Sequence, residues 1–539
     1  MPRPSRLVWE RHRSQITSLY HSGVTSHAII SHLLNETGVS ITPTHLRRLL
    51  QSWGVPRQRP RTEVTPELKE RIEALFFELA LTDTEIVNAL VLEGIQISLW
   101  KVQEVRRGIR LYRRQNTEQL AATMAEVRQF FEEERSTTNI VRHMGYRSLY
   151  VHMRQRFFNI PRDSLREVYA EFHEDAIAHR RARAERKRSG WTVPGPNYIW
   201  CVDGYCKLEY FGIEIYAGID AYSRYITWFY IGVSARTARN VFAQYIAVLS
   251  TYGFMPLALR SDHGVETTLL AGAQYLLSSE AHKVRYRQNR REITRAHPPQ
   301  AVDPAIAAFN TEDNDLEFED CFIYGDGTKN VKIERWWGEL CQGRSMFWRS
   351  FFGQLQAEGL FSRTRIEDRV ALLYWYMPRI RYEFMDFVKL WNSHRIRKQR
   401  NREHVVSGKP YCLWSFSKAT DFRVSVPPET LAELQRIVDW DKVDLDEYLP
   451  QSTMEICNNI VASWGELPNT VSENRPYLEQ YLRLKDTLRD YDRAKTEPRL
   501  SLVVHPVGGL DHIRSFFDEQ RIDLDRVDQI EREEIAIGF

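Results

Sequence analysis

The sequence predicts an α/β core with a mixed sheet and flanking helices, preceded by all-α domains and followed by a mostly helical C-terminal region. Two short apolar runs, 198–202 and 255–259, precede aspartates and have the length of buried strands. Between them, residues 238–252 carry apolar side chains at helical spacing, which favours a parallel strand–helix–strand crossover. Residues 7–114 and 361–390 show helical periodicity alone.

Bulk composition is that of a folded protein whose charges are segregated. Of the 539 residues, 43% are hydrophobic and 12% aromatic, which excludes a disordered chain and allows roughly three or four domains. The formal net charge is only +3, but residues 1–61 contain nine Arg and two Glu, whereas nine acidic residues and four Arg lie from Asp511 onward. A basic head and an acidic tail are typical of a nucleic-acid-binding protein.

Cysteine usage and hydropathy argue against a disulfide-rich, secreted or membrane-spanning protein. Six cysteines form no C-x-x-C pair and none precedes Cys201, so we expect a reducing compartment and no zinc-binding His/Cys domain ahead of the core. The N-terminus leads into no apolar segment typical of a signal peptide. The most apolar long stretch, 213–233, is interrupted by Asp220 and Arg224, so we expect no membrane span.

Residues 1–56 and 62–115 are predicted to be two copies of one helix-turn-helix unit. Apolar positions of the first copy recur in the second at an offset of 57 and, after a one-residue gap, of 56. Thr42 is a suitable N-cap, with Pro43 at the first helical position. The first unit also resembles the small helix-turn-helix domain found at the head of many fungal regulatory proteins.

The last helix of such a unit meets base edges in the major groove through its exposed N-terminal residues. The corresponding positions are Thr44, His45, Arg47 and Arg48 in the first unit, and Lys101, Gln103 and Glu104 in the second. The alternative is a helical packing module whose arginines are solvated, and the acidic residues of the second unit favour that alternative there.

Two further basic segments lie near a predicted helical connector, 118–190. They comprise Arg57, Arg59 and Arg61 in the linker between the units, and Arg180, Arg181, Arg183, Arg186, Lys187 and Arg188 before the core. The linker suits contact with a phosphate backbone. The second run is interpreted as a nuclear localisation signal, a phosphate-binding arm or both, and the alternative is a solvated helix face.

Three carboxylates at the edges of apolar segments are the candidate catalytic residues. Asp203 ends the first strand, Asp262 follows a later one, and Glu334 lies on a helix whose apolar residues share a face. Converging carboxylates repel one another unless cations lie between them, and such oxygen ligands suit Mg²⁺ or Mn²⁺. Two ions about 4 Å apart clamp the attacking and leaving oxygens of a phosphoryl transfer.

These three stretches resemble the D,D,E core of retroviral-type integrases and of the related cut-and-paste transposases. Accessory stretches at 193–197, 219–224 and 391–394 resemble the eukaryotic integrase-core branch. The resemblance implies a ribonuclease H-like fold, with a mixed five-stranded sheet and flanking helices, and a catalytic core at 191–350. It also implies a metal-binding triad of Asp203, Asp262 and Glu334.

The resemblance covers roughly residues 145–415, with two departures. His263 stands where many relatives carry Asn, and 72 positions separate Asp262 from Glu334, more than in retroviral enzymes. We therefore expect an insertion at about 280–320, basic in its first part and acidic in its second, that forms a largely disordered or extended loop.

Other carboxylates compete for the site. Asp220 lies in a strand-to-strand turn, where Asp more often caps backbone amides. Glu266 lies four residues after the second aspartate, and Asp326 lies in a Gly-rich loop. Trp336 and Trp337 are predicted to pack in the core rather than to stack on bases.

Beyond the core, residues 351–424 are predicted to be helical, and Arg395 and Arg397 suit phosphate positioning. Residues 425–539 are predicted to be mixed helix and loop, with a strand-like run at 503–510. This region carries no evident DNA chemistry, so we expect it to mediate self-association or to contact a partner.

The combined interpretation is a DNA integrase or transposase of a mobile element, acting in the nucleus on double-stranded DNA, both the element ends and the target. It would use two Mg²⁺ (or Mn²⁺) ions per active site. Joining two ends in concert needs two catalytic cores, so we expect a homo-oligomer on DNA. The alternatives are a domesticated DNA-binding protein that acts by recruitment, and a plain metal-dependent nuclease.

Overall fold

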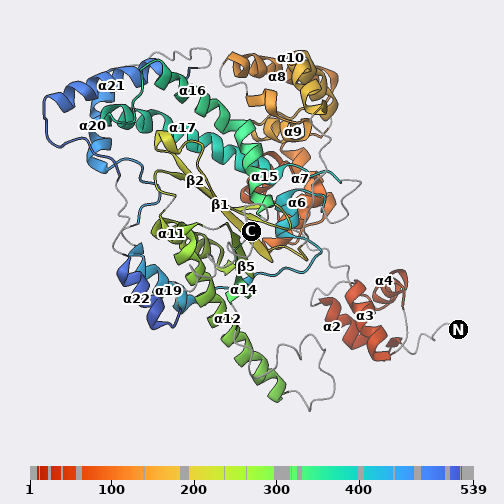
Figure 1. Cartoon of the computed structure of the whole chain (residues 1–539). Helices are drawn as coiled ribbons and strands as arrows, with labels where there is room; N and C mark the ends of the chain where they lie inside the picture. Colours follow the sequence, from red (N-terminus) through yellow and green to blue (C-terminus); the bar gives the residue numbers. More distant parts are fainter. Residues whose placement is uncertain are drawn as a thin grey trace.

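A computed structural model describes residues 9–10, 12–21, 26–37, 41–55, 63–113, 115–136, 140–182, 193–235, 237–262, 264–295, 316, 318–324, 330–398, 406–440, 443–465, 475–503, 510–522 and 524. Within these ranges, helical units precede a central sheet that is covered by helices on both faces (Figure 1). None of the helices in these ranges is long and apolar enough to cross a bilayer.

Two three-helix units open the chain. They comprise α2 (Arg13–His21), α3 (Ser26–Thr37) and α4 (Pro43–Ser52), then α5 (Pro66–Phe77), α6 (Asp83–Leu92) and α7 (Leu99–Gly108). The hydroxyls of Thr42 and Ser98 accept hydrogen bonds from the backbone N–H of His45 and Lys101, each at 3.2 Å, so the repeat predicted from the sequence extends to its helix caps. Each unit buries an apolar core of its own.

A helical connector follows, and it packs against the rest of the molecule. It comprises α8 (Thr117–Ser136), η1 (Ile140–His143), α9 (Tyr146–Gln155) and α10 (Arg162–Ala182). Helix α9 contacts α5 on one side and α17 (Ile366–Ser393) on the other. Phe131 and Leu149 of the connector belong to the same apolar cluster as α17. The second unit and the connector are therefore fixed to the main body, whereas the first unit stands apart in Figure 1.

The central sheet confirms the predicted fold class. Its strands are β1 (Ile199–Tyr205), β2 (Glu214–Asp220), β3 (Ile226–Gly232), β5 (Ala258–Ser261) and β6 (Phe322–Tyr324). Their order is β3-β2-β1-β5-β6, antiparallel among the first three and parallel from β1 to β6. The parallel step passes through α11 (Ala238–Tyr252), which has the boundaries predicted from its periodicity.

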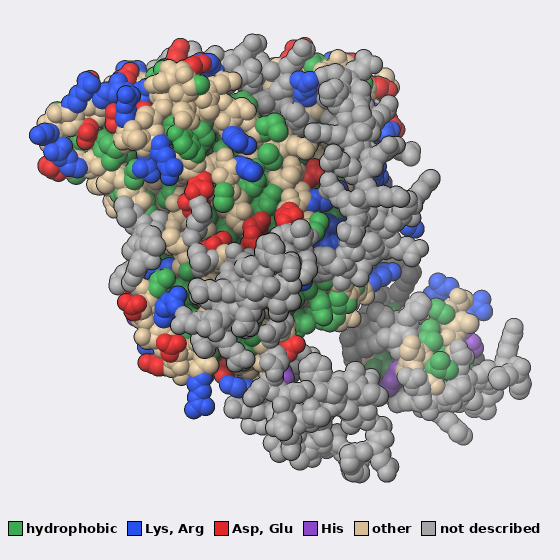
Figure 2. All heavy atoms as spheres, in the orientation of Figure 1, with side chains coloured by type: hydrophobic (Ala, Val, Ile, Leu, Met, Phe, Trp, Pro, Cys, Tyr) green, Lys and Arg blue, Asp and Glu red, His purple; other side chains and the backbone are tan. Residues whose placement is uncertain are grey.

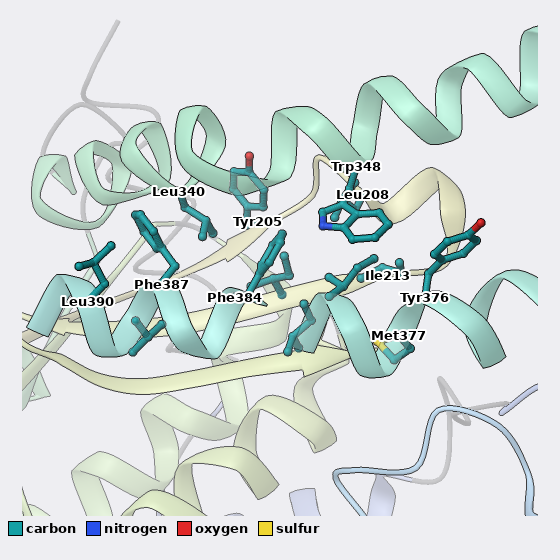
Figure 3. Close-up of a cluster of buried hydrophobic side chains, with 14 of the residues drawn as sticks. Tyr205, Leu208, Ile213, Leu340, Trp348, Tyr376, Met377, Phe384, Phe387 and Leu390 are labelled. Carbon is teal, nitrogen blue, oxygen red and sulfur yellow. The ribbon is translucent and has the colours of Figure 1, made fainter. Parts of the chain in front are cut away.

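Side-chain alternation along β1 divides the interior into two apolar layers. Cys201 and Tyr205 face α15 (Val331–Leu340), α16 (Met346–Ala357) and α17, whereas Trp200 and Val202 face α11 and α12 (Thr268–Arg295). Figure 3 shows the first layer, in which Phe384 and Phe387 of α17 point toward the sheet.

Two expectations about the core need correction. Asp203 was predicted to end its strand, but β1 continues through Tyr205, because the strand pairs with β2 over that whole length. The insertion at 280–320 was predicted to be a largely disordered or extended loop, but α12 is helical through Arg295. The basic first part of the insertion thus prolongs a helix that starts in the core.

The C-terminal region is built into both layers. Helices α19 (Pro428–Ile437) and α22 (Asp511–Glu519) contribute to the α11–α12 layer, and α20 (Gln451–Ala462) and α21 (Leu478–Arg493) contribute to the α17 layer (Figure 1). A two-stranded ladder, β4 (Phe254–Met255) with β7 (Val424–Ser425), links this region to the core. Val503 is in no strand, and 504–509 of the predicted strand-like run lie outside the described residues.

Candidate active site

The register of two parallel strands places Asp203 and Asp262 at the same end of the sheet. Cys201 of β1 pairs with Arg260 of β5. Asp203 lies two positions further along β1, and Asp262 follows directly after the last residue of β5. The crossover predicted from the sequence therefore does bring the two carboxylates to neighbouring positions.

Helix α15 is fastened to β1 at this end. The Asn330 side chain, just before the helix, donates from Nδ2 to the carbonyl of Val202 at 3.1 Å. Further along α15, Trp337 donates from Nε1 to Oδ2 of Asp203 at 2.8 Å, and its ring stacks on Tyr205 with 4.9 Å between centroids. Glu334 lies between these two attachments and is exposed. The helix therefore carries Glu334 to the edge of β1.

The electrostatics show that the three carboxylates act on one another. Burial raises the pKa of Asp203 to about 7, the negative charges of Asp262 and Glu334 add to this shift, and the Trp337 indole opposes it. The pKa of Glu334 is raised as well, first by burial and then by Asp262. Acidic side chains gather near the middle of the face drawn in Figure 2, where Figure 1 places β1 and α15.

A buried tyrosine lies beneath the same end of the sheet. Tyr216 pairs with Gly204 across β1 and β2, and its hydroxyl is buried with no hydrogen-bond partner within the described part of the chain. Its pKa is raised well above the usual value, first by burial and then by the charges of Glu266, Asp203 and Asp262. Glu266 is therefore a fourth carboxylate in this field, and neither the role of Tyr216 nor that of Asn330 was predicted from the sequence.

The donor chemistry of these residues fits a hard divalent cation. Carboxylate oxygens are the ligands that Mg²⁺ prefers, and a cation would lower the raised pKa of Asp203 and Glu334 by compensating their charge. In the ranges that the structure describes, no three His, Cys, Asp or Glu side chains converge on one point as a finished metal site. The carboxylates lie at one edge of the sheet but do not surround a single metal position.

The sequence matches the models of two known domain families. An integrase core domain model matches residues 191–290 and 305–414, which span the sheet, α15 and α17. The chain contains an integrase core domain. A second model, the Clr5 domain, matches residues 5–57 and so coincides with the first three-helix unit. A search of curated proteins finds no match to the sequence.

Integrase cores belong to the polynucleotidyl transferase superfamily, generally use divalent metals and generally bind DNA. The match is interrupted at 291–304, inside the predicted insertion. Two other motifs of the core, at Asp220 and at 391–394, have structural roles.

Asp220 holds the end of the integrase core opposite to Asp203. Its carboxylate accepts hydrogen bonds from the backbone N–H of Asn197 and from both the N–H and the hydroxyl of Ser223, at 2.5 to 2.7 Å. The Asn197 side chain in turn accepts from the indole of Trp200 at 3.0 Å. Asp220 therefore caps backbone amides, as its turn position indicated. Asp326, the remaining competitor, lies outside the described residues.

The 391–394 motif fastens α17 to the sheet. Trp391 donates to the carbonyl of Arg224 at 2.8 Å. Asn392 accepts from the backbone N–H of Ile226 at 2.8 Å and donates to its carbonyl at 3.2 Å, completing the backbone hydrogen bonding at the start of β3. Trp336 is buried and Trp337 nearly so, which agrees with the predicted core role of both.

The predicted DNA-binding residues lie on several separate elements. Thr44, His45, Arg47 and Arg48 are exposed on α4, and Figure 2 shows Lys and Arg side chains on the outer surface of that unit. Lys101 is half-buried and pairs with Glu104 at 3.2 Å. Arg395 and Arg397 are exposed after α17. Arg180 and Arg181 lie at the end of α10 with side chains outside the described part, which also excludes Arg57, Arg59, Arg61, Arg183, Arg186, Lys187 and Arg188.

Proposed function

We propose that the protein is a DNA integrase or transposase of a mobile element that cleaves phosphodiesters and transfers strands through Asp203, Asp262 and Glu334. The observation that carries this proposal is the seating of α15 against β1. That contact brings the helix with Glu334 to the edge where the two aspartates lie. The pKa of both Asp203 and Glu334 is raised there, first by burial and then by the charge of Asp262.

The roles of the chain's own residues follow from their contacts. The three carboxylates would hold two Mg²⁺ or Mn²⁺ ions, which supply charge stabilisation and an activated oxygen nucleophile in phosphodiester chemistry. The Trp337 indole fixes the orientation of the Asp203 carboxylate. Asn330 fixes the start of α15 and so the position of Glu334. The aromatic layer beneath, with Tyr205 stacked on Trp337, keeps this edge rigid.

DNA recognition is assigned to the first three-helix unit. Its α4 exposes Thr44, His45, Arg47 and Arg48, and the unit is joined to the main body by a linker with three arginines. The cationic run at 180–188 is proposed to serve nuclear localisation. We expect deletion of residues 1–56 to abolish sequence preference in footprinting while metal-dependent nicking persists. Equal footprints for both proteins would place recognition elsewhere.

A second candidate function is a domesticated DNA-binding protein that acts by recruitment. The Clr5 domain at residues 5–57 favours it, because the first unit resembles a domain found on regulatory proteins. A plain nuclease is disfavoured, because end-specific recombination needs sequence recognition and general degradation does not.

The deciding experiment incubates full-length protein with labelled ends of the flanking element and Mn²⁺, and scores nicking and joining separately. Joining supports the integrase. Nicking of any duplex without joining supports the nuclease, and binding without either reaction supports the recruitment protein. Light scattering with and without paired ends tests the proposed homo-oligomer, which a monomer that joins both ends in concert would contradict.

A further inference from the structure

A small pocket lies where three parts of the chain meet. Its volume is about 280 Å³. The second three-helix unit contributes Ala80, the connector contributes Arg147, Tyr150 and Arg162, and the segment after α17 contributes Arg395 and Lys409. Pockets for whole small molecules are typically about 300 to 1,000 Å³, so this one suits a compact group.

The walls are fixed by hydrogen bonds between the three parts. Lys409 donates to the carbonyl of Ala80 at 2.7 Å and to Glu85 at 2.9 Å, which fastens the second unit to the post-core segment. The guanidinium of Arg162 lies over the ring of Tyr150, 4.7 Å from its centroid. The post-core wall begins where α17 ends, and the preceding Asn392 is bonded to β3. The pocket is thus a preformed feature.

Its charge is positive and largely uncompensated. Lys409 is paired with Glu85, but none of Arg147, Arg162 and Arg395 forms an ion pair with any described residue. The pKa of Arg147 is lowered, first by burial and then by the positive charges of Arg395, Arg162 and Arg397. Like charges held together in this way repel, and an anion between them would relieve the repulsion.

We propose that this pocket binds one phosphate group of the DNA backbone and so fixes the duplex against the second unit, the connector and the core at once. Guanidinium groups match phosphate oxygens in pairs of parallel hydrogen bonds. Backbone phosphate is favoured over a free anion because Arg397, exposed next to the pocket, extends the cationic surface beyond it. This assignment rests on the proposed action on DNA.

The test measures binding of full-length protein to a duplex of arbitrary sequence by fluorescence anisotropy, in EDTA and at several salt concentrations. Arg147→Gln combined with Arg395→Gln should weaken binding roughly tenfold and reduce the slope of log affinity against log salt by about one. Arg493→Gln is the control, because it removes an arginine of α21 whose side chain is 74% exposed. Its DNA affinity and salt dependence should equal those of the wild type. Arg395→Lys, which keeps the charge, should lie between them.

Each outcome separates this site from the proposed catalysis. Wild-type affinity and slope in the double variant, with an unchanged melting temperature, would overturn the proposal. So would inorganic phosphate that raises the melting temperature of the wild type alone while both proteins bind DNA equally, because the occupant would then be a free anion. If the pocket variants lose DNA affinity but the wild type never nicks, the pocket stands and the catalytic function fails.

Discussion

The two ends of the central sheet each bury an aspartate, and the two are treated in opposite ways. Asp220 is fully buried and accepts three hydrogen bonds from Asn197 and Ser223, which limits the rise of its pKa to about 6. Asp203 has two donors, the Trp337 indole and the backbone N–H of Gly204, and two carboxylates in its field, and its pKa is raised to about 7. The first arrangement satisfies the charge of the carboxylate with donors, whereas the second places carboxylates close enough to repel one another.

The comparison teaches that burial alone does not set the environment of a carboxylate, because the hydrogen-bond donors and the neighbouring charges differ at the two ends. Both aspartates have pKa values raised by burial. What differs is the balance, because three donors outweigh the single charge of Asp421 at Asp220, whereas two donors face two carboxylates at Asp203.

The largest expected effect is on catalysis at the Asp203 end. Asp203→Asn, Asp262→Asn and Glu334→Gln should each lower strand cleavage by about 1,000-fold or more, because each removes ligand charge while leaving DNA binding nearly intact. Glu339→Gln, an exposed glutamate on the same helix, is the control and should cleave normally. A triad variant that keeps substantial activity would remove that residue from the site.

The next effect is on stability, where substitution of Asp220 should cost more than substitution of Asp203. Asp220→Ala should lower the free energy of unfolding by about 3 kcal/mol, because it leaves the N–H groups of Asn197 and Ser223 buried without an acceptor. Asp203→Asn should leave stability unchanged or raise it by about 1 kcal/mol, because it removes repulsion. Urea unfolding of both variants measures this, and equal losses would contradict the comparison.

A third carboxylate, Glu383, allows the effect of burial on stability to be tested by changing the pH. Glu383 accepts from Trp348 Nε1 at 2.9 Å, and burial raises its pKa to about 7, above the ordinary value of 4.5. Its contribution to stability is therefore full below about pH 4.5 and is lost as pH rises through 7. Glu383→Gln keeps the acceptor and should stabilise the protein by about 2 kcal/mol at pH 8 and much less at pH 5. Equal effects at both pH values in thermal melts would contradict this assignment.

The smallest effect is cation-induced stabilisation at the Asp203 end. Mn²⁺ at several times its dissociation constant should stabilise the wild type by about 1 kcal/mol, because it binds the folded state alone. The increase in melting temperature should vanish in Asp262→Asn and persist in Glu339→Gln. A shift that survives in Asp262→Asn would place the cation elsewhere.

Sequence patterns predicted the features that local spacing controls. The periodicity of 238–252 gave both ends of α11, and the strand–helix–strand order gave the neighbouring positions of Asp203 and Asp262. Thr42 could be predicted as a cap because its chemistry acts on the next three residues. These predictions depend on periodicity, on helix caps and on the order of the elements, all of which can be seen in the sequence.

The features that the sequence did not reveal depend on distant partners. The second half of α12 is rich in charge, so its composition resembles a solvated loop although it continues a helix of the core. Asn330 gives no local signal, because the Val202 carbonyl that it binds lies 128 positions away. The packing of α19 and α22 on α11 and α12 could not be foreseen, because an amphipathic pattern indicates a buried face without naming the surface that covers it.

The ladder between β4 and β7 has a consequence for synthesis. It joins Phe254–Met255 to Val424–Ser425, and the layer beside it is completed by Phe516, Phe517 and Leu524. During translation, the strands that carry both aspartates emerge from the ribosome long before the helices that cover them. The sheet that carries the candidate active site must therefore wait, with one apolar face uncovered, until residues near 524 have been added. Products that terminate early would meet chaperones or proteases before they met DNA.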